Sequence, residues 1–281
     1  MKTNLFKSTL AIFFFAAIAM VSCDRDENLQ PGTEVEEEQA LEESSVAEDA
    51  ADDALEMSYQ GEVQLASAGG RVASDCPVIT HDKVNKKIII DFGDGCQGPG
   101  GRTRRGKIIV TYSGEPGDSI ANRIITFENY FVNNKGITGT IELRDISVNP
   151  AGNLVCTRRL IDLTVTFPDG RTIVYNGSRT REWLSGRGDD DPTNNIYRIT
   201  GELTGVSSTG RSFTHKIIEP IIADWSCAAS GNFARVAGMV ELTKLKGYDV
   251  RKRIIHYGDG VCDNVITVIT FRRTYTVTIT D

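Results

Sequence analysis

Six cysteines are the residues of this chain with the clearest chemical potential. No two are spaced as Cys-x₂-Cys, so a zinc site is not indicated. Cys76 and Cys96 flank one strand-like segment, and Cys227 and Cys262 flank another. This spacing predicts two disulfides, Cys76–Cys96 and Cys227–Cys262, of the kind found in oxidising compartments. Cys156 is left over, and its strand-like surroundings predict a buried thiol.

The sixth cysteine, Cys23, follows a segment typical of a secretory signal. Two lysines precede an apolar run at residues 10–21, and small Ser22 follows it. The run is too short to span a bilayer. A cysteine directly after the small residue resembles a bacterial lipoprotein signal, in which that cysteine is lipidated and becomes the new N-terminus. We therefore expect a signal peptide at residues 1–22 and a palmitate-type, multiply acylated Cys23 that anchors the chain stably.

A glycine-rich loop at residues 98–107 carries four cations: Arg102, Arg104, Arg105 and Lys107. Such a loop could bind an anion, for example a phosphate or an acidic sugar. The favoured interpretation is a solvated basic hairpin that balances the acidic leader; attraction to that leader, weakened by salt, is a further alternative. Its glycine spacing is similar to that of nucleotide-binding loops, but a strand-like segment follows instead of a helix. No nucleotide cofactor is predicted.

Residues for catalysis or metal binding do not form a recognisable constellation. The three histidines, His81, His215 and His256, are scattered along the chain. Serine-hydrolase and zinc-protease motifs are absent from the sequence. The aspartates near glycines suit turns better than a calcium site. We therefore predict a non-enzyme without metal or cofactor; the alternative is a carbohydrate-active hydrolase whose two carboxylates meet only in space.

The leader between Asp24 and Glu56 holds 14 acidic residues and one basic residue. It has few large apolar side chains and no aromatic ones, so it lacks the surface to offset its ordering entropy. We expect a flexible tether over residues 23–58, kept extended by charge repulsion. The helix-forming composition of residues 39–55 leaves open a transient or partner-docked helix. Acidic residues soon after Cys23 also fit a surface-export signal loosely.

The remaining residues, 59–281, consist mostly of strand-like runs and turns. Runs such as KKIIIDF and LIDLTVTF are rich in β-branched and aromatic residues and alternate partly between polar and apolar. This pattern predicts an all-β, antiparallel meander forming a sandwich or a rolled sheet. A weak echo between residues 88–97 and 254–264 leaves open two related halves meeting near residues 180–195. No linker-like stretch divides them, which favours a single body.

Several segments together resemble a group of uncharacterised cell-envelope lipoproteins from Bacteroidota. They are CPVIT (76–80), IIIDFGDGCQGPGGRTRRGKIIVTYSG (88–114), ITFENYFVNNKGITGT (125–140) and HYGDGVCDNVITV (256–268). The resemblance covers most of residues 74–281. It implies secretion, lipidation and a β-rich body, and it supplies no catalytic residues.

These observations predict a membrane-anchored envelope lipoprotein with a non-catalytic binding or scaffolding β body. We expect it at the outer membrane, with the surface-exposed side favoured over the periplasmic side. Its expected partners are the membrane, through the lipid, and a glycan or an envelope or host protein. Nucleic acid is not expected, because of the compartment and because the body beyond the acidic leader has only a small net charge.

Overall fold

The computed structural model describes residues 31–67, 71–72, 76–98, 101–114, 122–187, 191–246 and 249–279. Cys23 and the signal peptide lie outside this described part. The elements are α1 (Pro31–Ser67), β1 (Arg71–Val72), β2 (Val78–Asp82), β3 (Lys87–Asp91), β4 (Cys96–Gln97), β5 (Thr103–Tyr112), β6 (Arg123–Val132), β7 (Lys135–Val148), β8 (Leu154–Thr166), β9 (Thr172–Ser185), the 3₁₀ turn η2 (Pro192–Asn194), β10 (Ile196–Val206), β11 (Ser212–Asp224), α2 (Trp225–Ala229), β12 (Arg235–Lys246), β13 (Asp249–Asp259), β14 (Val265–Ile269) and β15 (Thr274–Thr278).

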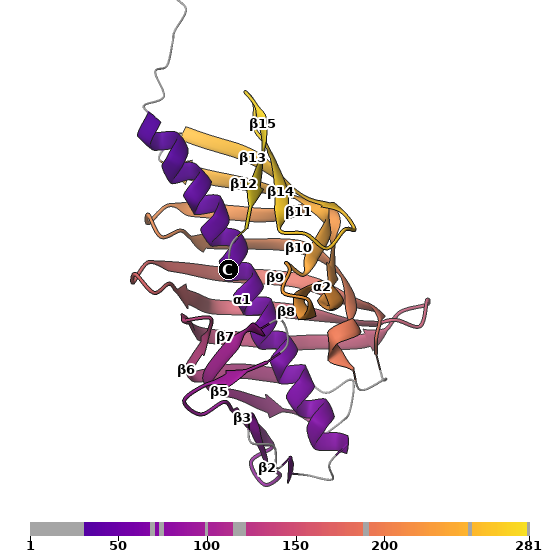
Figure 1. The fold of residues 1–281 in the computed structure, drawn as a ribbon. Coiled ribbons are helices and arrows are strands. Elements are labelled where there is room, and N and C mark those ends of the chain that lie inside the picture. Colours follow the sequence, from indigo (N-terminus) through magenta and orange to yellow (C-terminus); the bar gives the residue numbers. More distant parts are fainter. Residues whose placement is uncertain are drawn as a thin grey trace, which may run out of the picture.

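All the strands belong to one antiparallel sheet, and strands that follow one another along the chain are neighbours in it. The order runs from β1 to β15, and only β4 lies off this path, paired with β5. Figure 1 shows the strands stacked as one long curved sheet. The predicted all-β antiparallel meander is thus confirmed, as one open sheet and not as a two-sheet sandwich. The sheet continues across residues 180–195, where Ile196 of β10 pairs with Ser185 of β9.

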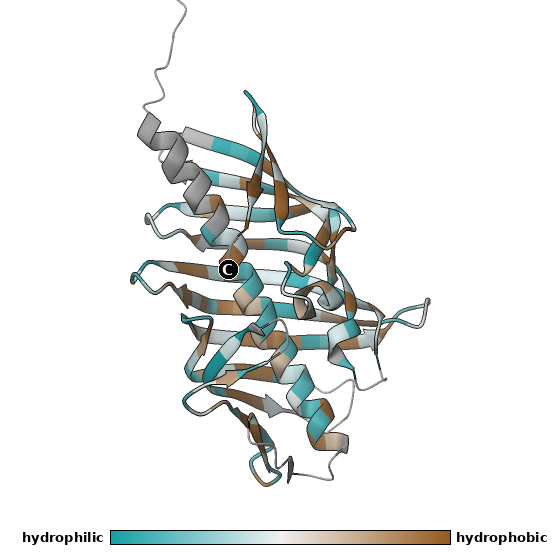
Figure 2. Ribbon diagram, in the orientation of Figure 1, coloured by the Kyte–Doolittle hydropathy of each residue, from teal (hydrophilic) through white to brown (hydrophobic). Residues whose placement is uncertain are grey.

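Alternation along the strands builds the inner face of the sheet. In β3, Ile88 and Ile90 are buried, and they lie opposite Val110 and Ile108 of β5. Successive side chains in a strand point to opposite faces, so these four residues form one apolar patch of cross-strand pairs. Figure 2 shows hydrophobic and hydrophilic residues interspersed along most of the strands. This is the period-two pattern from which the strands were predicted.

The long helix α1 lies diagonally across the inner face of the sheet (Figure 1). Every residue from 43 to 58 is buried. Because an α-helix completes a turn in about 3.6 residues, an unbroken run of this length means that the helix is covered on all sides. Small Ala50 and Ala54 are both buried and leave room for close packing. The outer side of the helix is covered partly by Trp225 and Ala228 of α2, near Met57.

The extended tether expected at residues 23–58 is wrong for residues 31–58, which belong to α1. The expectation assumed that an acidic segment with few large apolar residues has nothing to bury against. The sheet supplies arginines on its inner face, so the carboxylates of α1 are neutralised inside the molecule instead of repelling one another in water. The helix-forming composition of residues 39–55 correctly indicated a helix in this segment. No helix in the described ranges is long and apolar enough to cross a membrane.

Both predicted disulfides are supported. Cys76 and Cys96 have Cα atoms 5.8 Å apart and join the segment before β2 to β4. Cys227 and Cys262 have Cα atoms 5.2 Å apart and join α2 to the segment after β13. These separations lie in the normal range for a disulfide. Cys156 carries a free thiol, as predicted, but the residue is half-buried and not fully buried as expected.

Candidate functional site

A buried ionic interface joins α1 to the sheet. We call its helical side the acidic stripe: Glu48, Asp49, Asp52, Asp53 and Glu56, all of them buried. Residues four apart on a helix lie above one another. Glu48, Asp52 and Glu56 therefore form one line along α1, and Asp49 and Asp53 form the line beside it. The stripe is wide enough to meet arginines from two directions.

The opposite side of the interface consists of arginines that lie far apart in the sequence, in strands or, for Arg102, just before β5. Five of them are buried, and the side chain of Arg181 is 12% exposed. We call them the arginine set: Arg102, Arg104, Arg158, Arg179, Arg181 and Arg235. Arg179 and Arg181 are two residues apart in β9, so they point to the same face. Arg158 of β8 lies directly opposite Arg179 in the ladder. Strand periodicity and register thus bring guanidinium groups together beneath the helix.

Glu48 and Asp52 share one cluster of cations. Glu48 accepts hydrogen bonds from both terminal nitrogens of Arg179, each at 3.1 Å, and lies 2.8 Å from Nη1 of Arg235. Nδ1 of His215 also contacts this carboxylate. Asp52 pairs with Arg158 and accepts a hydrogen bond from Nη2 of Arg235 at 2.6 Å. Arg235 therefore bridges successive turns of α1 and ties both to β12.

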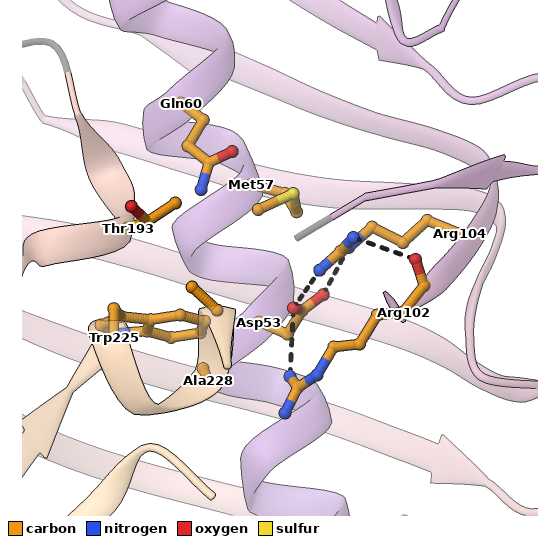
Figure 3. A pocket seen from close by; sticks show the side chains of 9 residues that line it. Asp53, Met57, Gln60, Arg102, Arg104, Thr193, Trp225 and Ala228 are labelled. Atoms are coloured by element: carbon orange, nitrogen blue, oxygen red, sulfur yellow. Dashed lines mark hydrogen bonds and ion pairs between the residues drawn. The ribbon is translucent and has the colours of Figure 1, made fainter. Parts of the chain in front are cut away.

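Asp49 and Asp53 face the start of β5. Arg104 donates two hydrogen bonds to Asp53, at 2.8 Å from Nε and 2.5 Å from Nη2 (Figure 3). Arg102 donates to Asp53 at 3.1 Å and to Asp49 at 2.5 Å. The cavity beside Asp53, Arg102 and Arg104 measures about 10 Å³, which is room for about one water molecule and not for an organic substrate. A second cavity, of about 380 Å³, lies beside Asp49 and Arg102 and is also lined by Phe233 and Ile279.

Glu56 continues the stripe toward β9 and β10. It accepts hydrogen bonds from Arg181 at 2.8 Å, from Asn195 at 2.8 Å and from the Tyr197 hydroxyl at 3.0 Å. The Arg181 guanidinium also lies 3.3 Å above the Tyr197 ring centroid, a cation–π contact. One turn and a half further along α1, Glu62 accepts hydrogen bonds from Arg123 of β6. The ionic contacts therefore extend over most of the buried helix.

The pKa values of these carboxyls show where charge or burial dominates. Burial alone would raise the pKa of Glu48, but Arg179, His215 and Arg235 hold it well below its usual value. The same competition brings the pKa of Asp52 down to about 2, mainly through Arg158 and Arg235. At Glu56 burial outweighs Arg181 and the hydrogen bonds, and the pKa is raised. Burial also lowers the pKa of His215, despite its contact with Glu48.

The acidic stripe and the arginine set together hold α1 on the sheet and leave few carboxylates free for catalysis. The carboxylates of the stripe are engaged by arginines, and a catalytic acid or base needs access to a substrate proton. Buried ion pairs often add little net stability because of desolvation, but removing one partner is strongly destabilising. The interface therefore specifies how α1 sits on the sheet, since a shift along the helix would leave several buried charges unpaired.

The four cations predicted as a possible anion site are divided between different contacts. Arg102 and Arg104 bind the acidic stripe, which corresponds to the alternative of attraction to the leader. Arg105 points elsewhere, with its guanidinium 3.4 Å from the centroid of the Phe131 ring. Lys107 lies 3.7 Å from carboxylates of Asp91 and Glu128. A pocket shared by all four is not formed.

The other reactive side chains are also separated. His81 hydrogen-bonds the Tyr112 hydroxyl at 2.5 Å, His215 belongs to the Glu48 cluster, and His256 lies near Asp259. Burial raises the pKa of the Cys156 thiol, which lowers its reactivity. Within the described ranges, no group of three or more His, Cys, Asp or Glu side chains is placed to hold a metal ion.

Arg158, Arg179, Arg181 and Arg235 were not recognised from the sequence as partners of the leader. One signal was present: Arg179-Thr-Arg181 places two arginines on the same side of a strand, and Arg102-Thr-Arg104 repeats the spacing. Cations at positions that alternation assigns to the inside require a buried anion. The acidic leader is the segment with enough negative charge to satisfy them. No family profile, curated protein or solved structure matches the chain.

Proposed function

We propose that the chain is an outer-membrane lipoprotein whose β body binds or scaffolds other molecules at the cell envelope. The observation that carries this proposal is the enclosure of α1 by the sheet. The helix begins only eight residues after Cys23, so a lipid at that cysteine would hold the whole body close to the membrane. The carboxylates buried on α1 are occupied by arginines, which supports a binding role over a hydrolytic one.

The length of chain between the lipid and the fold limits where the body can be. Eight residue steps span at most about 28 Å. A flexible tether ending at residue 58 would allow a reach several times greater. The proposed protein is therefore a membrane-proximal platform. Its sheet would offer an exposed outer face and turns to a glycan, an envelope protein or a host protein.

Lipidation is tested by replacing Cys23 with Ala and separating membrane from soluble fractions after a high-salt wash. Wild type should pellet with membranes, and the mass of its N-terminal peptide should include the acyl chains. Cys23→Ala should lack the acyl mass and leave the washed membranes. Cys156→Ala is the matched control and should behave as wild type. Acyl-free wild type, or a Cys23→Ala chain that still pellets, would contradict the anchor.

The side of the membrane is tested by protease treatment of intact cells, with lysed cells as the control, followed by immunoblotting. We expect the band to disappear from intact cells, because the acidic residues after Cys23 favour surface export. A band that survives until lysis would place the body in the periplasm. Ligand searches would then start from envelope proteins instead of glycans and host proteins.

A further inference from the structure

The turn between β14 and β15 displays a large aromatic side chain to solvent. Phe271 is fully exposed, and Arg272 beside it is exposed as well. The turn is internally hydrogen-bonded: the Thr270 hydroxyl accepts the backbone N–H groups of Arg272 at 3.3 Å and Arg273 at 3.0 Å, and donates to the Arg273 carbonyl at 2.9 Å. A short turn built this way holds the ring outward. Burying such a ring against an apolar surface is favourable.

This turn lies at the end of the molecule where the chain leads to Cys23. Figure 1 shows the first turns of α1 and the β14–β15 turn at the same end of the long axis of the sheet. The β2–β3 turn, at the other edge of the sheet, lies at the opposite end. A lipid at Cys23, within about 28 Å of Pro31, would bring the Phe271 end toward the bilayer.

Both positive and negative side chains lie at the β14–β15 end of the molecule. The cations are found in the β14–β15 turn and in the neighbouring strand β13. Arg272 follows Phe271 directly, and Lys252 of β13 pairs with Glu241 at 3.1 Å. The leader itself is acidic. An aromatic ring next to an arginine is the combination that lies at the boundary between lipid headgroups and acyl chains, where the cation meets phosphate. The ring therefore supplies most of the expected contact, and the arginine selects anionic lipid.

We propose that the β14–β15 turn is a second membrane contact, in which Phe271 enters the headgroup boundary of an anionic phospholipid bilayer and Arg272 pairs with lipid phosphates. This inference rests on the proposed lipid anchor at Cys23, which makes the contact intramolecular. One lipid anchor and one peripheral contact together fix an orientation, whereas the anchor alone leaves the body free to rotate. The inner face of the sheet and α1 would then stand in a defined direction relative to the membrane.

The test couples residues 23–281, carrying Cys156→Ser, through the Cys23 thiol to a maleimide lipid in vesicles. This chemical anchor makes the result independent of lipidation in cells, which the Cys23→Ala fractionation tests separately. Phe271→Trp serves as the probe, with brominated acyl chains as quenchers. The protein lacking this substitution provides the background from Trp183 and Trp225. The vesicles contain phosphatidylethanolamine and phosphatidylglycerol, and phosphatidylcholine vesicles are the neutral comparison.

A matched control is available at the opposite end of the molecule. Val84 in the β2–β3 turn is 92% exposed and stands among Lys83, Lys86 and Lys87. We expect strong quenching for Phe271→Trp and none above background for Val84→Trp. Adding Arg272→Ser should reduce the quenching on anionic vesicles only. Absence of quenching at position 271, or equal quenching at position 84, would overturn the proposal.

Discussion

Each carboxylate in the acidic stripe is paired with members of the arginine set, so that replacing one carboxylate should destabilise the whole interface. Asp53 accepts hydrogen bonds from both Arg102 and Arg104. Asp53→Asn keeps the shape but leaves two buried guanidiniums short of negative charge. We expect a loss of about 3–5 kcal/mol in the free energy of unfolding, measured by urea denaturation. Exposed Asp94→Asn is the control and should change it by less than about 0.5 kcal/mol. Similar losses in both variants would contradict the buried pairing.

Stability should also depend on pH through Asp52. Its pKa in the folded chain is about 2, against an ordinary value of 3.8. Because the folded value is depressed, its contribution of about 2 kcal/mol is complete above pH 3.8 and is lost as the pH falls through 2. The pKa of Glu56 is raised, so that group acts in the opposite sense and favours the folded state at lower pH.

The measurement is the urea midpoint at a series of pH values. Wild type should lose stability between about pH 4 and pH 2, and Asp52→Asn should show a shallower slope in that interval because it has no proton to take up. Equal slopes for the two proteins would mean that Asp52 is not held by Arg158 and Arg235.

At the scale of elements, α1 differs most from what composition indicates. A tether exchanges its amide hydrogens at the rate of an unfolded chain, whereas a helix enclosed on all sides exchanges only when the fold opens. We expect residues 43–58 to be protected to the level of the central strands β8 and β9. Mass-resolved hydrogen exchange measures this directly. Peptides from residues 43–58 that exchange fully at the earliest time would contradict the enclosure.

The strands and the disulfides could be predicted because their signals are local. Alternation such as Lys87–Asp91 can be recognised within five residues, and the cysteines flank strand-like segments. The ionic interface could not be predicted, because its partners are distant in the sequence: Asp52 and Arg235 are 183 positions apart. A sequence shows an excess of charge in one place and arginines elsewhere. Only the register of the sheet decides that they meet.

For the whole molecule, two disulfides tie together segments that are separated in the sequence, by 20 residues for Cys76–Cys96 and by 35 for Cys227–Cys262. Cys227–Cys262 ties α2, which covers the outer side of the helix, to the segment after β13. Replacing both cysteines with Ala should lower the free energy of unfolding by about 2–4 kcal/mol, because the closed loop constrains the unfolded chain. Thermal denaturation with Cys156→Ala as control measures it. An unchanged midpoint would show that the bridge does not restrain the fold.

The enclosure of α1 also imposes an order of events on the newly made protein. The helix is synthesised before any of the described strands, yet Arg235 of β12 follows Asp52 by 183 positions. The helix α1 can therefore complete its ion pairs only after β12, near the end of the chain, has been made. Contacts so remote in sequence make folding slow. During that interval the many carboxylates of the leader keep it soluble in water, so the same charges serve first as a safeguard against aggregation and afterwards as the interior of the finished protein.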